Sequence, residues 1–409
     1  MNPVTVPERE GAVRPSQPRA AAVGMVGGGQ LSRMTAAPAA ALGIPFRVLA
    51  ASPDESAAQV VADVVLGSHD SLEDLVRLSE GCAAVTFDHE HVPPDHLRAL
   101  ERAGVAVRPS SAALVHAQDK VTMREALQAV GVPAPGFRVI SGDSAEERAA
   151  EVAEAGDHLG WPVVLKVSRG GYDGRGVWVV SGAAEAAELM ASTPLVPGAR
   201  WLAEERVDFT RELSAQVARS PSGQAVAYPV VRTVQVEGMC SEVVAPCPDL
   251  PEARAMEAQG IALRIAGELD VVGMLAVEMF DTGSEILVNE LAMRPHNSGH
   301  WSIDGAVTSQ FENHLRAVLD LPLGDPHPIA EYAVMVNVVG PRDSATLPPL
   351  REAYRHVLAR DPGVKVHLYG KEPRPGRKLG HVTVVGRDLD DLLARAHHAA
   401  DYLMGVIDE

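Results

Sequence analysis

Two acidic residues, Glu278 and Glu290, lie in stretches that otherwise read as buried strands, MLAVEMF and ILVNELAM. A carboxylate in apolar surroundings is costly unless a cation accompanies it. Carboxylate oxygens that share a cation with substrate phosphates are the usual protein ligands of Mg²⁺. The polar run RPHNSGHW, which contains Arg294, His296 and Asn297, follows shortly after Glu290. The pattern predicts a magnesium site at this pair of strands, next to a polar loop.

A glycine-rich segment supplies a second candidate site. Lys166 lies near the end of an apolar strand, VVLKV, and residues 170–176, GGYDGRG, precede the next apolar run. Backbone amides in such a hairpin can close over phosphates, while a strand lysine supplies a point charge to them. An ordinary flexible hairpin has a similar composition, so this loop alone indicates phosphate binding without identifying ATP.

An earlier glycine loop, GMVGGGQ over residues 24–30, also lies between an apolar strand and a helix-compatible stretch. Asp54 follows about 20 residues later, as the acidic residue of a dinucleotide fingerprint would. The spacing is not that of GxGxxG, however, and similar loops occur in α/β domains that bind no nucleotide. An NAD-dependent oxidoreductase is therefore kept only as an alternative.

The composition narrows the class of protein. The 409 residues are 46% hydrophobic and 22% charged, and at about 100–200 residues per domain we expect two or three globular domains. The net charge of −18 argues against wholesale binding to nucleic acid or to an anionic membrane. The three cysteines suit neither a disulfide framework nor a zinc motif. No apolar run approaches the ~18 residues of a membrane span.

Residues 1–20 mix proline with both signs of charge and lack an apolar core. We expect them to be a disordered extension rather than a signal peptide, and the protein to be cytoplasmic.

The hydrophobic pattern changes twice along the chain. Apolar strands at 21–26, 44–50, 59–65 and 83–87 alternate with helical stretches, which is typical of a parallel α/β domain ending near residue 119. The next part holds two β-rich runs around the second glycine loop and a helix at 183–190. From about residue 201 many segments alternate at strand period. We expect a sizeable antiparallel sheet there, with helices at 251–269 and from 389.

Four segments together resemble a known family: GGGQLSRM, KVSRGGYDGRG, VNELAMRPHNSGHW and YGKEPRPGRKLGH, which span about residues 24–381. They are similar to ATP-grasp enzymes, and within these to the 5-(carboxyamino)imidazole ribonucleotide synthases. The resemblance implies an α/β and α+β protein with the ATP-grasp fold. It would comprise an N-terminal parallel α/β (pre-ATP-grasp) domain at 21–119, a small lid at 120–205 and a larger α+β domain at 206–409.

The resemblance also implies a reaction. ATP phosphorylates bicarbonate, and the carboxyphosphate carboxylates the exocyclic amine of 5-aminoimidazole ribonucleotide, releasing ADP and phosphate in purine biosynthesis. ATP and Mg²⁺ would be the cofactors, and the enzyme would be a homodimer. A sister ATP-grasp ligase with another acceptor, such as glycinamide ribonucleotide or biotin, stays open as an alternative. So does a nucleotide-binding regulatory protein that has lost catalysis.

The family's functional residues carry over position by position. Glu278 and Glu290 match the magnesium carboxylates, and Arg206 and Val207 the backbone contacts to adenine. Lys120 occupies a position where relatives commonly have arginine, and Gln235 one where they often have histidine; Lys120 keeps the charge but lacks the planar fork. The nucleotide-binding set comprises Lys120, Lys166, Gly171, Tyr172, Asp173, Gly174, Arg175, Gly176, Val177, Glu204, Glu205, Arg206, Val207, Glu212, Gln235, Asn289 and Glu290.

The acceptor site matches two groups of residues. Arg294, His296, Asn297, Tyr172 and Asp173 would lie at the reacting groups. The segment KEPRPGRK, residues 371–378, is here called the basic loop. Its Lys371, Arg377 and Lys378, together with Arg294, would bind the ribonucleotide.

The pairing of the two strands that carry Glu278 and Glu290 leads to a geometric prediction. With a five-residue turn over 281–285, Phe280 pairs with Ile286, and Glu290 falls on the same face as Glu278, one diagonal step away. A four-residue turn would place the two carboxylates on opposite faces, and that placement would contradict the magnesium assignment.

Overall fold

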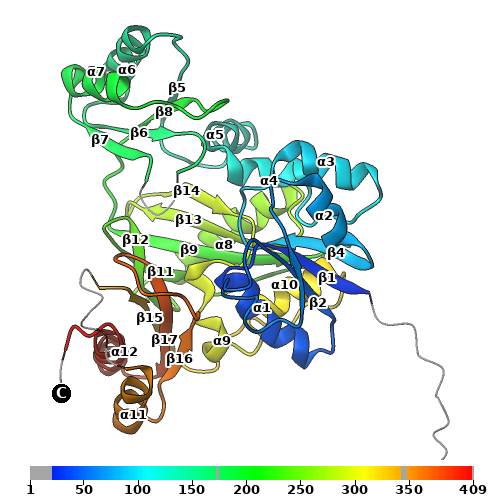
Figure 1. The fold of residues 1–409 in the computed structure, drawn as a ribbon. Coiled ribbons are helices and arrows are strands. Elements are labelled where there is room, and N and C mark those ends of the chain that lie inside the picture. The colour runs from blue at the N-terminus through cyan, green and yellow to red at the C-terminus, as the bar shows by residue number, and fades with distance from the viewer. Residues whose placement is uncertain (1–20, 172–174, 342–346, 348, 408–409) are drawn as a thin grey trace, which may run out of the picture.

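The computed structural model describes residues 21–171, 175–341, 347 and 349–407. Three sheets organise the chain (Figure 1): a parallel sheet, a small antiparallel sheet, and a large antiparallel sheet. The sequence pattern predicts the parallel sheet and the later large antiparallel sheet, and only two β-rich runs between them. The expected α/β and α+β architecture is therefore confirmed. No helix of the described residues is long and apolar enough to cross a membrane.

The N-terminal part is a four-stranded parallel sheet in the order β3-β2-β1-β4. Helices follow β1, β3 and β4, whereas turns connect β2 to β3. The strand expected over 59–65 begins only at Asp63, because residues 55–61 form successive turns that start at Glu55 and Ala57. The elements are β1 Ala22–Val26, α1 Gln30–Ala41, β2 Phe46–Ala50, β3 Asp63–Leu66, α2 Leu72–Ser79, β4 Cys82–Phe87, α3 Pro94–Arg102, α4 Ser111–Gln118 and α5 Lys120–Ala129.

The lid is a four-stranded antiparallel sheet in the order β5-β8-β6-β7. Two helices, α6 and α7, pack on it through a core that includes Ile140, Val152, Leu165 and Trp201. Figure 1 shows this unit standing above the rest of the chain. Its elements are β5 Phe137–Ile140, α6 Ala145–Leu159, β6 Val163–Val167, β7 Val177–Val180, α7 Ala183–Ser192 and β8 Trp201–Glu205.

The large sheet runs β14-β13-β9-β11-β12-β15-β17-β16, with β10 paired to β9. Helix α8 packs on β9 and β13, and α12 packs on β15 and β17. The elements are β9 Arg211–Arg219, β10 Ala225–Ala227, β11 Val231–Val236, β12 Met239–Ala245, α8 Glu252–Glu268, β13 Gly273–Asp281, β14 Ile286–Ala292, η1 Asn297–Gly299, α9 Ser302–Gly305, α10 Gln310–Val318, β15 Tyr332–Val339, α11 Leu350–Arg360, β16 Lys365–Leu368, β17 Lys378–Gly386 and α12 Leu389–Leu403.

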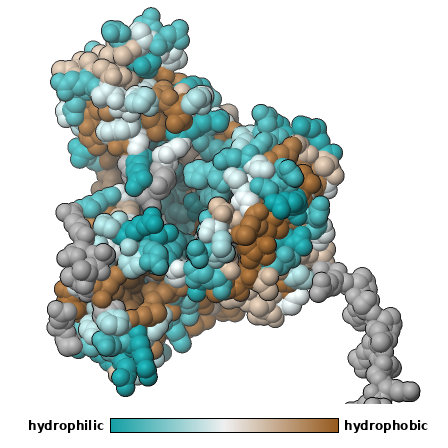
Figure 2. Space-filling model, viewed as in Figure 1, coloured by the Kyte–Doolittle hydropathy of each residue, from teal (hydrophilic) through white to brown (hydrophobic). Residues whose placement is uncertain are grey.

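The three parts surround a hollow. Figure 2 shows the surface sunk between the lid and the two lower lobes, with mostly hydrophilic residues around it. The N-terminal sheet and the large sheet share one apolar core, to which Phe87, Leu97, Leu275 and Val288 belong. The floor of the hollow is therefore continuous, while the lid has a core of its own.

The β13–β14 turn differs from the five-residue expectation. Asp281 pairs with Ile286 and Phe280 with Leu287, so the turn has only four residues, 282–285. Asp281 joins the ladder because its carboxylate accepts the backbone N–H of Gly283, which adopts φ +90°. The predicted register is therefore wrong by one residue.

A β-bulge at Asn289 restores the shared face. Met279 pairs with Val288, but Glu278 pairs with Glu290, so Asn289 has no partner on β13. An extra residue in one strand reverses the alternation of faces beyond it. Glu278 and Glu290 consequently lie directly opposite each other, rather than diagonally.

Two helical glycines should respond to alanine with opposite signs. At Gly156 in α6, a Cβ would lie 2.2 Å from the Trp161 ring, whereas at Gly260 in α8 nothing lies within 4 Å. Alanine improves helix propensity by about 1 kcal/mol, and overpacking costs about 1–3 kcal/mol. We expect Gly260→Ala to raise the melting temperature and Gly156→Ala to lower it. Calorimetry of both variants measures this, and a stabilised Gly156→Ala would contradict the packing described.

Candidate active site

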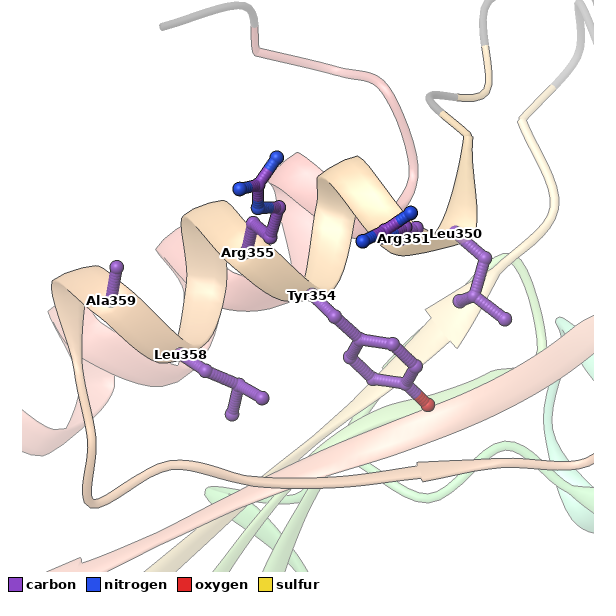
Figure 3. A pocket seen from close by; sticks show the side chains of 6 residues that line it. All are labelled: Leu350, Arg351, Tyr354, Arg355, Leu358 and Ala359. Carbon is purple, nitrogen blue, oxygen red and sulfur yellow. The ribbon is translucent and has the colours of Figure 1, made fainter.

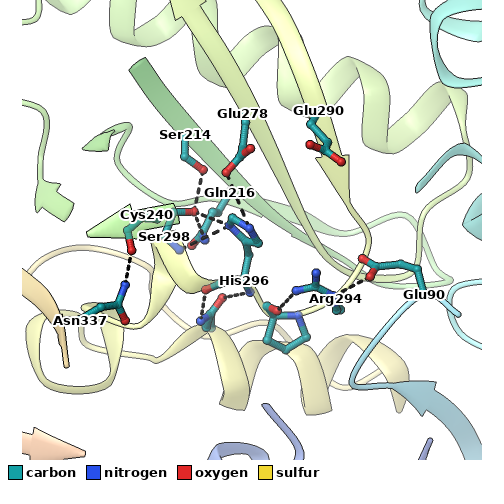
Figure 4. A network of polar contacts seen from close by, with 12 residues as sticks. Glu90, Ser214, Gln216, Cys240, Glu278, Glu290, Arg294, His296, Ser298 and Asn337 are labelled. Carbon is teal, nitrogen blue, oxygen red and sulfur yellow. Dashed lines mark hydrogen bonds and ion pairs between the residues drawn. The ribbon is translucent and has the colours of Figure 1, made fainter. Parts of the chain in front are cut away.

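A row of polar side chains crosses three strands below the lid. Ser214 on β9 is paired with Glu278 on β13, which is paired with Glu290 on β14. Glu212 lies two residues from Ser214, on the same face of β9. Figure 4 shows Ser214, Glu278 and Glu290 side by side at this end of the sheet. The structure thus contains the expected pair of carboxylates, Glu278 and Glu290, and Glu212 lies near this pair.

The carboxylates of Glu278 and Glu290 repel each other, and nearby positive charge compensates them unequally. Burial, together with the nearby Glu290 and Glu212 carboxylates, raises the pKa of Glu278 to about 7. The Lys120 ammonium, which is hydrogen-bonded to Glu290, holds the pKa of Glu290 below its usual value. Lys120 therefore compensates the charge of Glu290 more fully than that of Glu278.

Such a donor set fits a hard divalent cation. The described residues contain no group of three or more His, Cys, Asp or Glu side chains that could hold a metal ion. Two carboxylates leave most of the ligand positions of Mg²⁺ to waters and substrate oxygens, which is its usual arrangement.

Two lysines from different elements point to this row. Lys120 begins α5, and Lys166 lies on the lid strand β6. Lys166 forms an ion pair of 2.7 Å with Glu204 and donates a hydrogen bond of 3.1 Å to the side-chain oxygen of Asn289. Burial lowers the pKa of Lys166, while Glu204 opposes that shift. Glu204, Asn289 and Lys166 are thereby brought together, as the nucleotide-binding set requires.

Arg124 is a buried residue of this region that sequence reasoning missed. Its guanidinium lies 2.6 Å from Glu204 and donates to the backbone carbonyls of Val288 and Asn289. A signal was present: Arg124 occupies the position between Val121 and Leu127 on the buried face of α5. A charged residue within an apolar stripe indicates a buried polar partner.

Glycines allow the two ends of the lid loop to approach each other closely. Gly176 adopts φ +75°, and its carbonyl accepts from Val167. A Cβ at Gly171 would lie 2.6 Å from the Arg175 carbonyl, so the two ends of the loop approach closely. Val177 begins β7 opposite Lys166. Tyr172, Asp173 and Gly174 lie outside the described residues.

The remaining predicted nucleotide residues lie in the connection from β8 to β9 and on strands β9 and β11 of the large sheet. Glu205 ends β8 and accepts the N–H of Gly136, and Arg206 and Val207 follow it in the connection to β9. Burial raises the pKa of Glu212. Gln235 lies on β11 where the pairing with β12 shifts register, opposite Cys240.

The RPHNSGHW loop passes under the carboxylates. His296 Nε2 lies 3.7 Å from Glu278, and Nδ1 contacts Ser298 Oγ at 2.9 Å. Burial, with Arg294 and Lys378 nearby, lowers the pKa of His296 to about 3, so its ring is neutral at pH 7. Neither amide atom of buried Asn297 has a hydrogen-bond partner in the described part of the chain. The loop thus presents an unused amide and a neutral imidazole.

Arg294 connects this loop to the N-terminal sheet. It forms an ion pair of 2.8 Å with Glu90, just after β4, and Figure 4 shows the pair at the edge of the polar network. Beside it, Asp88 accepts the N–H of Leu31 at the start of α1, and burial raises the pKa of Asp88 to about 6. Asp88 and Glu90 are site residues that sequence analysis missed, although FDHEHVP is an acidic run directly after a strand.

The first glycine loop is filled by carboxylates rather than left open for an anion. A Cβ at Gly29 would lie 2.1 Å from Asp88, and one at Gly28 would lie 2.2 Å from Glu55. Two acidic groups at this loop would repel a pyrophosphate. The geometry therefore disfavours the dinucleotide-binding alternative, and the glycines serve close packing.

The basic loop folds back toward this same region. Lys371 donates to the side chain of Gln30 at the start of α1. Lys378 begins β17, and its charge contributes to the low pKa of His296. Arg377 is half-buried and donates to the Glu372 carbonyl, whereas Arg374 is exposed. The structure thus brings Lys371, Lys378 and Arg294 to one side of the carboxylate row.

A separate groove has different chemistry. A concavity of about 670 Å³ lies along one side of α11, between Leu350 and Ala359 (Figure 3). Its lining includes Leu350, Tyr354 and Leu358, with two arginines and no acid. It lacks the paired carboxylates and is not the candidate active site.

Comparison with known proteins agrees with this geometry. Three family descriptions match: the ribonucleotide synthetase preATP-grasp domain at 20–118, the ATP-grasp domain at 125–311, and the phosphoribosylaminoimidazole carboxylase C-terminal domain at 333–395.

Curated relatives match over most of the chain. The N5-carboxyaminoimidazole ribonucleotide synthase of Mycobacterium leprae is 54% identical over 93% of this chain and 89% of its own. The enzyme of Mycobacterium bovis is 52% identical over 93% and 87%.

Solved structures agree as well. The N5-carboxyaminoimidazole ribonucleotide synthetase of Thermus thermophilus has a TM-score of 0.82 and 38% identity, covering 95% of this chain and 99% of that one. The Aspergillus clavatus synthase, in complex with ADP and 5-aminoimidazole ribonucleotide, has a TM-score of 0.84 and 31% identity, covering 94% and 99%. The resemblance read from the motifs is confirmed, and the chain belongs to the N5-carboxyaminoimidazole ribonucleotide synthase family of ATP-grasp ligases.

Proposed function

We propose that this protein carboxylates 5-aminoimidazole ribonucleotide with bicarbonate and ATP, forming a C–N bond in purine biosynthesis. A bicarbonate oxygen attacks the γ-phosphorus of ATP, and ADP leaves. The exocyclic amine then attacks the carboxyl carbon of carboxyphosphate, phosphate leaves, and the amine loses a proton. Family membership supports this reaction, and the opposed carboxylates between Lys166 and the RPHNSGHW loop are the observation that carries it.

The nucleotide half of the proposal uses the lid and the hinge. Lys120 and Lys166 supply positive charge to the ATP phosphates, and residues 171–177 cover them. The segment 204–207 reads adenine through the backbone groups of Arg206 and Val207, Glu212 binds the ribose hydroxyls, and Gln235 is a further nucleotide contact. Glu278 and Glu290 hold Mg²⁺, which neutralises phosphate charge when bound. The direct opposition of these two carboxylates across the strand pair supports a cation there, and burial together with the Glu290 and Glu212 charges raises the pKa of Glu278 to about 7.

The acceptor half uses the opposite side of the carboxylate row. Arg294, Lys371, Arg377 and Lys378 bind the anionic ribonucleotide. The neutral ring of His296 and the unpartnered amide of Asn297 can orient its polar groups. Tyr172 and Asp173 complete the site from the lid. We further propose the domain division at 119/120 and 205/206, a homodimeric state and a cytoplasmic location, on the family resemblance.

ADP release tests the proposed reaction directly. The purified enzyme should release ADP only when Mg²⁺, bicarbonate and 5-aminoimidazole ribonucleotide are all present. Glycinamide ribonucleotide or biotin in place of this acceptor tests the sister-ligase alternative. ADP release that depends on either of those acceptors would replace the proposed substrate, and a complete lack of turnover would support a regulatory protein.

Removing one metal carboxylate should abolish most activity. Glu290→Gln keeps the size of the side chain but removes its charge, and the loss of one preorganised charge at a reacting phosphate costs about 100-fold or more in kcat/KM. We also expect the Mg²⁺ concentration for half-maximal rate to rise. Glu257→Gln, in the exposed Arg254–Glu257 pair of α8, is the control. Unchanged Mg²⁺ dependence in Glu290→Gln would refute the metal assignment.

The basic loop should affect one substrate only. We expect Arg377→Ala to raise the KM for 5-aminoimidazole ribonucleotide roughly 10–100-fold, as losing a charged hydrogen bond of ~1.5–3 kcal/mol predicts. The KM for ATP should stay nearly unchanged. Arg374→Ala, an exposed cation of the same loop, should change neither constant. An equal rise in the KM for ATP and in the KM for the ribonucleotide would show that the loop has a structural role instead.

A further inference from the structure

One fully buried arginine joins the lid to the large sheet. Arg124 on α5 has no exposed surface and donates to three acceptors on two sheets. Its Nε lies 2.6 Å from Glu204 of the lid strand β8, and its two terminal nitrogens lie 3.0 Å and 2.8 Å from the carbonyls of Val288 and Asn289 on β14. A buried guanidinium needs such partners, because an unpaired buried charge is strongly destabilising.

The contact of Arg124 with Glu204 affects the position of Lys166 in the lid. Arg124 takes one carboxylate oxygen of Glu204, and Lys166 takes the other at 2.7 Å. Arg124 and Lys166 together hold the pKa of Glu204 at about 2, so it is ionised at neutral pH. Arg124 therefore orients the carboxylate to which Lys166 is paired, and thereby the lysine itself.

The second contact is at the bulge that brings the two site carboxylates together. Successive carbonyls of a regular strand point to opposite sides, so one guanidinium reaches both Val288 and Asn289 where the strand departs from regular geometry. Asn289 is the residue left without a partner on β13, and its side chain contacts Lys166. The next residue is Glu290, whose position opposite Glu278 depends on this bulge.

We propose that Arg124 is a positioning residue that sets Lys166 and Glu290 relative to each other without touching substrate. The inference rests on the proposed function, in which these two side chains act on the same nucleotide and metal. Lysine cannot replace it, because an ammonium is a point charge and lacks the planar fork that reaches a carboxylate and two carbonyls at once.

Arg124→Lys tests the role with its charge retained. We expect the KM for ATP and the Mg²⁺ concentration for half-maximal rate each to rise at least 10-fold. The KM for 5-aminoimidazole ribonucleotide should stay within twofold, since its proposed contacts lie on the other side of the carboxylate row. A purely structural role would lower the active fraction and kcat but leave all three constants alone, and that result would overturn the proposal.

Arg219→Lys is the matched control. Arg219 also bridges a carboxylate, Asp270 at 2.9 Å, and a backbone carbonyl, Val271 at 3.1 Å. It lies at the far end of β9, where it pairs with Gly273. We expect its replacement to change none of the three constants. A rise in the ATP and Mg²⁺ constants equal to that of Arg124→Lys would show a non-specific effect and contradict the inference.

A second measurement covers the case in which Arg124→Lys folds poorly. Glu204→Gln removes the charge that Arg124 orients, and the increase in melting temperature on adding ADP and Mg²⁺ reports nucleotide binding without turnover. We expect this increase to shrink in Glu204→Gln and in any foldable Arg124 variant, but not in Arg219→Lys. A full increase in Glu204→Gln would overturn the proposal. The increase in melting temperature with ADP and Mg²⁺ can be measured even if the wild type does not use 5-aminoimidazole ribonucleotide. A failure of the proposed function can therefore be distinguished from a failure of the proposed role of Arg124.

Discussion

The organisation of the site follows from two carboxylates that are held directly opposite each other. Glu278 and Glu290 occupy one face of a strand pair, with Glu212 close by. In a partly apolar setting, like charges so placed need compensation, or one of them stays protonated. Lys120 supplies compensation to Glu290, and the raised pKa of Glu278 shows that the pair is incompletely balanced. Two carboxylates in this arrangement favour the binding of a cation, and a bound cation can neutralise the charge of phosphate groups.

The surrounding charges divide into two groups around this pair. On the lid side, Lys166, Glu204 and Arg124 form a buried network in which every charge has a partner. On the other side, Arg294 and the basic loop supply the cations, with Glu90 holding Arg294. In a chain of net charge −18, such local concentrations of positive charge determine where anionic substrates bind. The described cations thus fall into two groups, one on the lid side of the carboxylate pair and one at Arg294 and the basic loop.

Histidines of the two most specific motifs also meet inside the fold. The rings of His300 and His381 lie 5.0 Å apart, and His381 contacts the hydroxyl of Tyr369 at 2.7 Å. Tyr369 precedes the basic loop, and its carbonyl accepts a hydrogen bond from Ser56 of the N-terminal part. These buried contacts fasten the loop that carries Lys371 to the loop that carries His296. The two motifs are thus parts of one wall of the site.

The sequence by itself determined the features that are local. Strand and helix periods predicted a parallel α/β part followed by a large antiparallel sheet, and the motifs GGYDGRG and RPHNSGHW indicated the family. Even the shared face of Glu278 and Glu290 was expected, although for a reason that proved wrong. Only the tertiary structure decided the rest. The bulge at Asn289 depends on how the turn closes at Asp281, and the partners of Arg124 lie 80, 164 and 165 residues away. No local pattern encodes such contacts, because they form only when packing brings distant strands against α5, and burial then makes each polar group require a partner.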